Sequence, residues 1–293
     1  MNNLRRTLSL LLALVMLVAL GAFASAEDSA SAETSVTLTD EDVASLSYLN
    51  GQLRVGMECA YAPNNWQESE ASDTNVPIEN VPGAYAEGYD VQIARIIADQ
   101  LGLELVVVKM DWDGLIEALN QGQIDAIIAG MADTESRKEA INFTSPYHET
   151  VYALMVNAGT QYENATSLAD FNGASVLGQK DTALDWTIDQ IEGVNHLTAV
   201  ASVPDMIARL QQGTCDAIVI NLENAPGYLA SNPNFVVISF PEGEGLDPGF
   251  KGACVGLRKS DDALLGLADA VLATIDQEQR DELWDTALNN QPT

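Results

Sequence analysis

The sequence predicts an α/β fold with two lobes, because one helix–turn–strand unit occurs twice. The first copy spans residues 115–128 and the second spans residues 206–219. In each copy, apolar residues at helical spacing lead to a Gly that can end a helix, and then to an Asp and a run rich in β-branched residues. This order is typical of a helix followed by a buried parallel strand. Each copy therefore predicts the centre of a separate lobe.

Residues 1–26 have the pattern of a signal peptide. Arg5 and Arg6 precede an apolar run over residues 8–24, and Ala-Ser-Ala at residues 24–26 supplies the small side chains that signal peptidase requires. We expect cleavage there and export of the remaining chain; a membrane anchor is the alternative. No Cys follows the apolar run, so the sequence shows no lipobox.

The chain is strongly acidic, with a formal net charge of −30 at pH 7. Such a charge repels nucleic acid and anionic lipid, so we expect neither as a partner. The acidity can serve only to keep the surface soluble, or it can attract cationic solutes.

The cysteines and histidines do not predict a metal site or a cofactor. Cys59, Cys215 and Cys254 lack metal-ligand spacing, and the histidines are His148 and His196. In an exported chain one disulfide is possible, and buried thiols are the alternative.

The first lobe is predicted to comprise residues 49–150 and 255–293, after a disordered leader at residues 27–48 that is rich in Ser, Thr, Ala and acids. Its expected elements, in order, are a strand at 53–57, a long loop at 59–89, a helix at 91–101 capped by Asp90, a strand at 103–109, the first repeat copy, and a short polar helix that carries Arg137.

The second lobe is predicted to comprise residues 151–254. Its expected elements are a strand at 151–156 that crosses between the lobes, a strand at 175–178, a helix at 182–191, the second repeat copy and a strand at 235–240. A strand at 253–258 then crosses back, and helices at 262–276 and 278–289 complete the first lobe. Two crossings form a hinge, which permits closure of the lobes around a ligand.

The two repeat copies also predict where a ligand binds. Gly130 and Asn221 stand at matching positions, where the strand of each copy ends. Ligands of open α/β sheets bind beyond the carboxyl ends of the strands. If the lobes face each other, both residues border one cleft.

Several motifs, in order, carry a resemblance to a known family. They are RVGMECAYAP at 54–63, GYD at 88–90, WDGLI at 112–116, GM at 130–131, TESR at 134–137 and FTSPY at 143–147. With them the chain resembles the polar amino-acid-binding proteins of ABC importers, the extracellular solute-binding proteins of family 3. The resemblance extends from residue 53 to about residue 292.

This resemblance implies a two-lobed periplasmic-binding-protein-like fold of type II, in which two α/β lobes are joined by a two-strand hinge. It implies a monomer that captures an amino acid outside the cell, in the periplasm or at the extracellular face, and presents it to an ABC permease in the membrane.

Arg137 is the candidate for binding the ligand carboxylate, because a guanidinium can hold both oxygens in one plane. In the family, the Arg of the Thr-x-x-Arg motif has a similar role. Backbone N–H groups near Ala132 would assist. The alternative is a surface Arg paired with Glu135 or Glu139.

Aromatic side chains are the candidate walls of the site. Tyr61 and Trp112 are expected at strand ends or in loops on the cleft side, where flat rings can cover a ligand side chain. Trp66 lies in a stretch that departs from the family pattern. Trp186 and Trp284 lie within helical patterns, so we expect both in the core.

Two positions depart from the family. Asp181-Thr182 replaces a Gly-Thr whose backbone receives the ligand carboxylate at a helix start. Asp181 either caps that helix or points into the cleft. Asn221 replaces an acid that binds the ligand ammonium, and Glu223 is either a substitute for that acid or a surface residue.

Glu58 follows the first strand. In relatives that take basic amino acids, an acid here resembles the partner of a cationic side chain. We therefore expect lysine, arginine or a similar cation, and Asn221 leaves room for a ligand without a normal α-ammonium.

An enzyme is the alternative to a binding protein. The fold also resembles that of exported cyclohexadienyl or arogenate dehydratases, which use an acid in the cleft. Asp181, Glu58 or Glu223 could act as a general acid. The sequence shows no nucleophile–base pair and no phosphate loop, so we expect a binding protein rather than an enzyme. A ligand-sensing module is a third interpretation.

Overall fold

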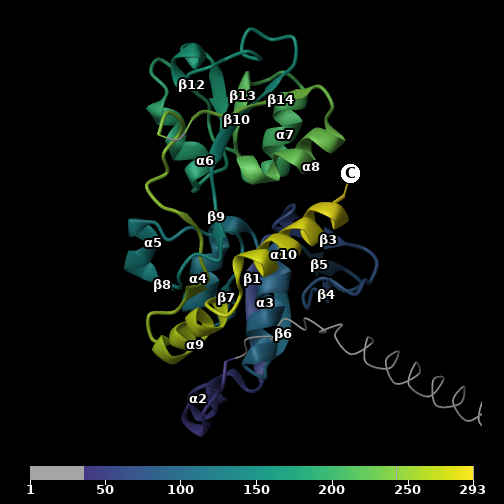
Figure 1. Cartoon of the computed structure of the whole chain (residues 1–293), viewed down its shortest axis with the longest axis vertical. Coiled ribbons are helices and arrows are strands. Elements are labelled where there is room, and N and C mark those ends of the chain that lie inside the picture. The colour runs from purple at the N-terminus through teal and green to yellow at the C-terminus, as the bar shows by residue number, and fades with distance from the viewer. Residues whose placement is uncertain (1–35, 242, 293) are drawn as a thin grey trace, which may run out of the picture. The chain divides into compact units, whose positions relative to one another are not determined.

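The computed structural model of the protein describes residues 36–241 and 243–292 (Figure 1). The predicted signal peptide at residues 1–26 and the beginning of the predicted leader lie outside the described residues. Over the part of the chain that is described, no helix combines the length and the apolar character that a membrane crossing requires.

The first of two five-stranded sheets has the strand order β6-β1-β7-β16-β8. Its strands are β1 (Gln52–Met57), β6 (Glu104–Lys109), β7 (Ala126–Ile127), β8 (Asn142–Phe143) and β16 (Gly256–Leu257). β1 pairs in parallel with β6 and β7, whereas β16 is antiparallel to β7 and β8. We call this sheet and the helices around it the first lobe.

The second sheet has the order β12-β11-β13-β10-β14 and has its own hydrophobic core. Its strands are β10 (Tyr152–Asn157), β11 (Ser175–Leu177), β12 (Asn195–His196), β13 (Ala217–Asn221) and β14 (Phe235–Ile238). β11 pairs in parallel with β12 and β13, and β10 runs antiparallel to β13 and β14. This sheet and its helices form the second lobe. β7 of the first sheet and β13 of the second are the strands of the two repeat copies.

Helices flank both sheets. In the first lobe they are α3 (Tyr89–Gln100), α4 (Leu115–Asn120), α5 (Glu135–Ala140), α9 (Asp262–Leu272) and α10 (Gln277–Asn290), with the short 3₁₀ turn η2 (Trp112–Gly114). In the second lobe they are α6 (Ala183–Trp186), α7 (Val203–Gln211) and α8 (Ala225–Ser231), with the 3₁₀ turns η3 (Leu168–Phe171), η4 (Thr187–Gln190) and η5 (Leu222–Asn224).

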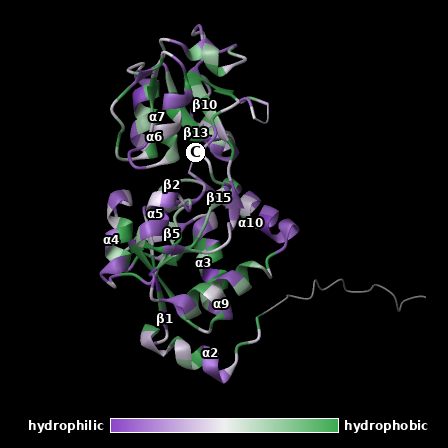
Figure 2. Ribbon diagram, turned by 90° about the vertical axis from the view of Figure 1, so that its left-hand side faces the viewer, coloured by the Kyte–Doolittle hydropathy of each residue, from purple (hydrophilic) through white to green (hydrophobic). Residues whose placement is uncertain are grey.

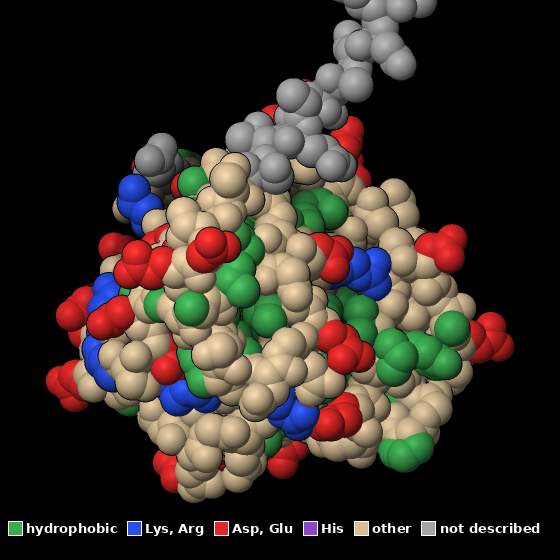
Figure 3. Space-filling model, turned by 90° about the horizontal axis from the view of Figure 1, so that it is seen from below, with side chains coloured by type: hydrophobic (Ala, Val, Ile, Leu, Met, Phe, Trp, Pro, Cys, Tyr) green, Lys and Arg blue, Asp and Glu red, His purple; other side chains and the backbone are tan. Residues whose placement is uncertain are grey.

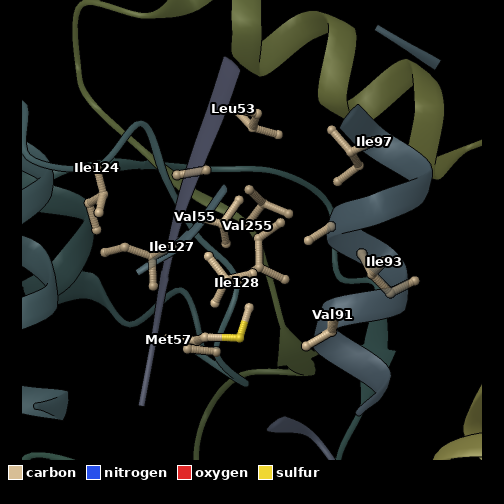
Figure 4. Packing of buried hydrophobic residues seen from close by; sticks show 14 of the residues in the cluster. Leu53, Val55, Met57, Val91, Ile93, Ile97, Ile124, Ile127, Ile128 and Val255 are labelled. Atoms are coloured by element: carbon tan, nitrogen blue, oxygen red, sulfur yellow. The ribbon is translucent and has the colours of Figure 1, made fainter. Parts of the chain in front are cut away.

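Hydrophobic side chains hold each sheet to its helices. In the first lobe, Val91 and Ile97 of α3 lie on the side of the helix that faces Val55 and Met57 of β1 (Figure 4), and all four are buried. Hydrophobic residues lie along β10 and β13 in the second lobe, whereas the residues of α10 are mostly hydrophilic (Figure 2). The burial of apolar side chains supplies most of the stability of such layers.

Two short strands lie where the chain passes between the lobes. β9 (His148–Glu149) precedes β10, and β15 (Gly252–Ala253) precedes β16; the two pair with each other in antiparallel fashion. A two-strand hinge is as predicted, but its position differs. The crossing strand predicted at 151–156 is β10 of the second sheet, and the one predicted at 253–258 is divided into β15 and β16. A short connection of this kind can absorb the backbone rotation that accompanies lobe closure.

The predicted loop at residues 59–89 is wrong in part, because it contains a small antiparallel sheet of order β2-β3-β5-β4. Its strands are β2 (Ala60–Tyr61), β3 (Asn65–Glu68), β4 (Val76–Pro77) and β5 (Tyr85–Glu87). Strands this short, separated by Pro and acidic residues, are too brief for an alternating hydrophobic pattern to reveal them.

The predicted cap of α3 by Asp90 is also wrong. The helix begins at Tyr89 after Gly88, and no side chain caps it. Asp90 is buried instead, where it accepts hydrogen bonds from Asn65 Nδ2 at 2.8 Å and from the Tyr147 hydroxyl at 2.6 Å. Burial raises the pKa of the Asp90 carboxyl. Its role is to join β3, α3 and the segment before the hinge.

The predicted disordered leader is wrong for its last part. Residues 40–45 form α2 (Asp40–Ser45), and the 3₁₀ turn η1 (Ser47–Leu49) follows it. Thr39 and Asp42 form a capping box at the start of α2. A Thr followed three residues later by an acid is a local signal for a helix start, and the acidic composition of the leader obscures it.

The three cysteines are free and buried, so of the two alternatives the structure has the buried thiols. Burial raises the pKa of the Cys59 and Cys254 thiols to about 12 and that of Cys215 to about 11. Cys59 belongs to the core of the first lobe and Cys215 to that of the second. Thiols with such pKa values remain protonated and unreactive near neutral pH.

Candidate functional site

A cavity lies between the lobes, and all eight residues predicted for the site line it. Six come from the first lobe and two from the second: Glu58, Tyr61, Trp112, Gly130, Ala132, Arg137, Thr182 and Asn221. The strand ends of the two repeat copies, at Gly130 and Asn221, therefore meet at one cavity, as the duplicated pattern predicts.

Arg137 spans the cavity from the first lobe to the second. Thr134 caps α5 by accepting a hydrogen bond from the Arg137 backbone N–H, which fixes the start of the helix. The guanidinium donates from Nη1 to the Ala132 carbonyl at 2.9 Å and from Nη2 to the Asp181 carbonyl at 2.7 Å. It also lies over the Trp112 ring, 5.2 Å from the ring centroid, in cation–π contact.

The positive charge of Arg137 has no acidic partner among the described residues. Its side chain forms no ion pair with Glu135 or Glu139 there, so the alternative of a paired surface Arg does not hold. Burial lowers the pKa of the guanidinium to about 10. A desolvated cation held only by neutral carbonyls attracts an anion strongly.

Glu58 occupies a buried position one residue after β1. Its side chain accepts weak hydrogen bonds from Gln179 Nε2 of the second lobe, 3.4 Å from each carboxyl oxygen. Burial and, to a smaller extent, the nearby charge of Asp111 raise the pKa of the Glu58 carboxyl to about 7. The same carboxyl borders an adjoining hollow that Asp111, Asp113 and Lys180 line.

Tyr61 and Asn221 join the two lobes on another wall of the cavity. The Tyr61 hydroxyl donates a short hydrogen bond to Asn221 Oδ1. Burial raises the pKa of Tyr61 well above its usual value. Gly130 has φ +66°, and a Cβ there would lie 3.1 Å from the Tyr61 ring. Gly is therefore needed at this strand end both for its backbone conformation and for the Tyr61 ring.

Glu223 is neither an exposed surface acid nor a wall of the cavity. Its side chain is 18% exposed. It accepts a hydrogen bond from Thr150 Oγ1 at 2.8 Å and lies 3.5 Å from His148 Nε2 in the hinge. Its carboxylate therefore faces the hinge and does not replace the missing acid at Asn221.

Thr182, not Asp181, caps the helix at the second-lobe wall. The Thr182 hydroxyl accepts a hydrogen bond from Leu184 N at 3.2 Å and donates to the Gln179 carbonyl at 2.8 Å. Asp181 has φ +60° and an exposed carboxylate near Lys180, so both predicted roles for its side chain are wrong. Its backbone carbonyl is what reaches Arg137.

The segment after Thr182 is shorter than predicted. The expected helix at 182–191 is the four-residue α6 followed by the 3₁₀ turn η4. Close packing fixes this turn, because a Cβ at Gly178 would lie 2.2 Å from the Leu184 carbonyl oxygen.

The three remaining tryptophans lie outside the cavity. Trp66 is buried, and its ring nitrogen donates to Glu68 at 2.6 Å. Trp284 packs against the first core and stacks on His148 with ring centroids 4.2 Å apart, as expected of a core residue. The core placement of Trp186 is wrong, because this side chain is 38% exposed at the end of α6. The short helix leaves its ring at the rim, edge-on to Phe250.

Other residues of the cavity are not among those predicted from the sequence; they include Tyr152, Gln179 and Phe250. Tyr152 opens β10, and burial raises the pKa of its hydroxyl above the usual range. The strand-end rule that found Asn221 would also have found Gln179, which stands two residues after β11. Phe250 lies before the second hinge strand, and no local pattern marks it.

Figure 3 shows the molecule from below, at the end of the first lobe away from the cavity. Asp and Glu side chains are spread over this face, with Lys and Arg between them. Among the described residues, no group of three or more His, Cys, Asp or Glu side chains is placed to hold a metal ion.

Comparisons with known proteins agree with this architecture. The family model of bacterial extracellular solute-binding proteins, family 3, matches residues 53–287. A probable histidine-binding protein of Campylobacter jejuni is 28% identical, over 89% of this chain and 88% of the relative. An L-arginine-binding protein of Pseudomonas aeruginosa is 27% identical, over 75% of this chain and 81% of the relative.

A solved structure shows the same fold. It is an amino acid ABC transporter substrate-binding protein from Streptococcus pneumoniae bound to L-arginine, with a TM-score of 0.73 and 25% identity, covering 86% of this chain and 99% of that one. The fold is thus the two-lobed periplasmic-binding-protein fold that the sequence predicts. Because the family model matches most of the chain, the protein belongs to the bacterial extracellular solute-binding proteins of family 3.

Proposed function

We propose that this protein captures an amino-acid-like solute with a cationic side chain in the cavity between its lobes and delivers it to an ABC importer. The observation that carries the proposal is Arg137, a half-buried cation at the cavity that no acid neutralises among the described residues. A ligand carboxylate is the group that such a guanidinium binds best, through two parallel hydrogen bonds.

The ligand would link the lobes by its carboxylate end. Arg137 belongs to the first lobe, and Thr182 stands on the facing wall in the second. A carboxylate that contacts both would favour the form in which the lobes are together. The ligand would then act by shifting a population between open and closed forms.

The cationic end of the ligand would lie toward Glu58. The adjoining hollow adds Asp111, Asp113 and Lys180, and Lys180 pairs with Asp113, so the net charge at this end of the site is negative. The Trp112 ring borders both spaces and offers a face to an alkyl chain or a guanidinium. The names of the relatives, which include histidine- and arginine-binding proteins, support the same class of ligand.

Titration calorimetry of the mature protein against L-arginine, L-lysine, L-histidine and L-glutamate tests the ligand class. We expect binding of at least one cationic member and none of L-glutamate. Tight binding of L-glutamate without binding of any cationic member would refute the proposed cationic side chain.

We further propose that the protein acts outside the cytoplasm, as a monomer, and that it binds its ligand without catalysing a reaction. The cavity lining offers one carboxyl, Glu58, and no nucleophile paired with a base. Incubation with prephenate or arogenate should yield no aromatic product. Formation of product with multiple turnovers would instead identify a dehydratase.

The proposed monomer is tested separately. Light scattering with and without ligand would detect any dimer.

A further inference from the structure

Charge is distributed unevenly along the cavity. Arg137 supplies the positive charge at one wall, and Glu58, backed by Asp111 and Asp113 in the adjoining hollow, supplies the negative charge at another. Asn221, on the wall made by the end of β13, contributes no charge. The lining therefore has one place for an anion and one for a cation.

The polar atoms of the Asn221 side chain already form hydrogen bonds with other residues of the protein. Its Oδ1 accepts the Tyr61 hydroxyl, and its Nδ2 donates to Thr150 Oγ1 at 3.3 Å and faces Glu223 Oε1 at 3.5 Å. The side chain is 8% exposed. It therefore offers a ligand little more than one further lone pair of a neutral carbonyl oxygen.

No other acid replaces the missing charge there. Glu223, two residues after Asn221, accepts hydrogen bonds from Thr150 Oγ1 and from the Val151 backbone, and it faces His148 of the hinge. It does not line the cavity. An ammonium beside Asn221 would be desolvated without a direct carboxylate contact, because the nearby Glu223 carboxylate is bonded to Thr150 and does not line the cavity. A hydrogen bond to a neutral acceptor has about half the strength of a charge-assisted one.

An ordinary cationic amino acid carries one carboxylate and two cationic groups, whereas this cavity matches one of each. We propose, building on the proposed function, that the preferred ligands are carboxylic acids with a terminal guanidinium or ammonium and no free α-ammonium. The carboxylate binds Arg137, the terminal cation lies toward Glu58, and the carbon beside the carboxylate, uncharged, lies near Asn221.

Matched ligand pairs in the unchanged protein test this inference. L-Arginine is compared with 5-guanidinopentanoate, and L-lysine with 6-aminohexanoate; each pair differs only in the α-amino group. Calorimetry should give a dissociation constant about ten-fold lower for the member without the α-amino group, the ratio expected when one charged hydrogen-bonding group loses its ionised partner.

The outcomes separate this inference from the proposed function. Equal or tighter binding of L-arginine and L-lysine overturns the inference and leaves a protein for cationic amino acids. Failure of all four compounds to bind overturns both proposals.

A substitution reverses the expected preference. Asn221→Asp places a carboxylate at the uncharged wall, so L-arginine should bind about ten-fold more tightly, whereas 5-guanidinopentanoate should not gain. Asn195→Asp, on an exposed strand of the same lobe, adds the same charge away from the cavity and should change neither constant. An equal gain for both members of the pair in Asn221→Asp would contradict the inference. If Asn221→Asp fails to fold, the ligand pairs in the unchanged protein still decide.

Discussion

The two lobes contribute different chemistry to the cavity between them. The first lobe supplies the charged side chains, Arg137 and Glu58, and the broad ring of Trp112. The second supplies neutral groups, the hydroxyl of Thr182 and the amides of Gln179 and Asn221. The contrast exists although each wall is built on a copy of the same helix–turn–strand unit.

This difference assigns separate tasks to the two lobes. Charged groups act over a longer range than neutral hydrogen-bonding groups, so the first lobe supplies most of the attraction for a charged ligand. The second lobe makes short-range contacts that need correct geometry, which is reached only when the lobes are together. The carbonyl of Asp181 helps to couple the two tasks, because it holds the Arg137 guanidinium across the cavity.

The largest effect is expected at Arg137. Arg137→Ala should weaken binding of a carboxylate ligand by at least about 100-fold in calorimetry, because a buried charge-assisted pair is lost. The unfolding midpoint of the ligand-free protein should change little, since the substitution also removes the cost of burying an unpaired cation.

Lys138→Ala provides the matched control for Arg137→Ala. Lys138 lies on the same helix but is exposed and pairs with Asp133 and Glu135, so its removal should leave the affinity nearly unchanged. Micromolar binding retained by Arg137→Ala would show that the first lobe does not grip the ligand through this residue.

The second effect, at Glu58, depends on pH. The pKa of this carboxyl is about 7 without ligand, so a cationic ligand that needs the carboxylate must displace a proton below that pH. Affinity for a cationic ligand should therefore rise as the pH increases from 6 to 8. Glu58→Gln should weaken binding by about ten-fold at pH 8 and remove this slope. Proton release measured in buffers of different ionisation enthalpy provides an independent check.

The same pKa predicts how Glu58 affects folding. Its folded pKa, about 7, lies above the ordinary value of 4.5, so Glu58 favours the folded state most below pH 4.5 and loses that contribution as the pH rises through about 7. Ligand-free Glu58→Gln should thus gain stability relative to the natural protein between pH 4 and pH 8, by about 2–3 kcal/mol. Denaturant unfolding at both pH values measures this. If the stability difference between Glu58→Gln and the natural protein is the same at pH 4 and pH 8, the pKa of Glu58 in the folded state lies near 4.5.

A smaller effect is expected in the second lobe. Thr182→Val removes a neutral hydroxyl and should weaken binding by about ten-fold or less, with a stability loss of about 1 kcal/mol from the lost helix cap. Thr187→Val is the control, because Thr187 is buried in the following turn and does not line the cavity. A loss for Thr182→Val as large as that for Arg137→Ala would break the contrast between the lobes.

The smallest effect is expected for the exposed ion pair between the lobes. Lys180 lies 3.3 Å from Asp113, and both side chains are more than half exposed. Lys180→Met should change ligand affinity by less than about three-fold, because such pairs contribute about 0–1 kcal/mol. Measurements at low and high salt should give the same ratio within that range.

The sequence predicted the parts of the site that depend on local patterns. Gly130 lies just beyond β7 of one sheet, and Asn221 ends β13 of the other. Ligands of open α/β sheets bind beyond the carboxyl ends of the strands, so the meeting of these two residues at one cavity could be foreseen for lobes that face each other. Arg137 was found because Thr134 and Arg137 match the Thr-x-x-Arg motif of the family, without which a surface Arg is the simpler interpretation. These signals survive in the linear sequence, since each depends on neighbours within a few residues.

Other features depend on contacts between distant segments and could not be predicted. Asp90 has the pattern of a helix cap, but partners from β3 and from the segment before the hinge draw it into the core. Trp186 ends α6, which is only four residues long, and its side chain stays exposed. The small sheet β2–β5 forms from strands too short to show a period. In each case tertiary packing overrides a local preference.

The alkylation rates of the buried cysteine thiols can report on local opening of the protein. Cys59 lies in one core and Cys215 in the other, and neither can react with an alkylating reagent until its surroundings separate. The labelling rate of each would thus measure the free energy of opening for its own half of the molecule. A ligand held by both halves should slow the two reactions together, whereas one held by a single half should protect one thiol alone.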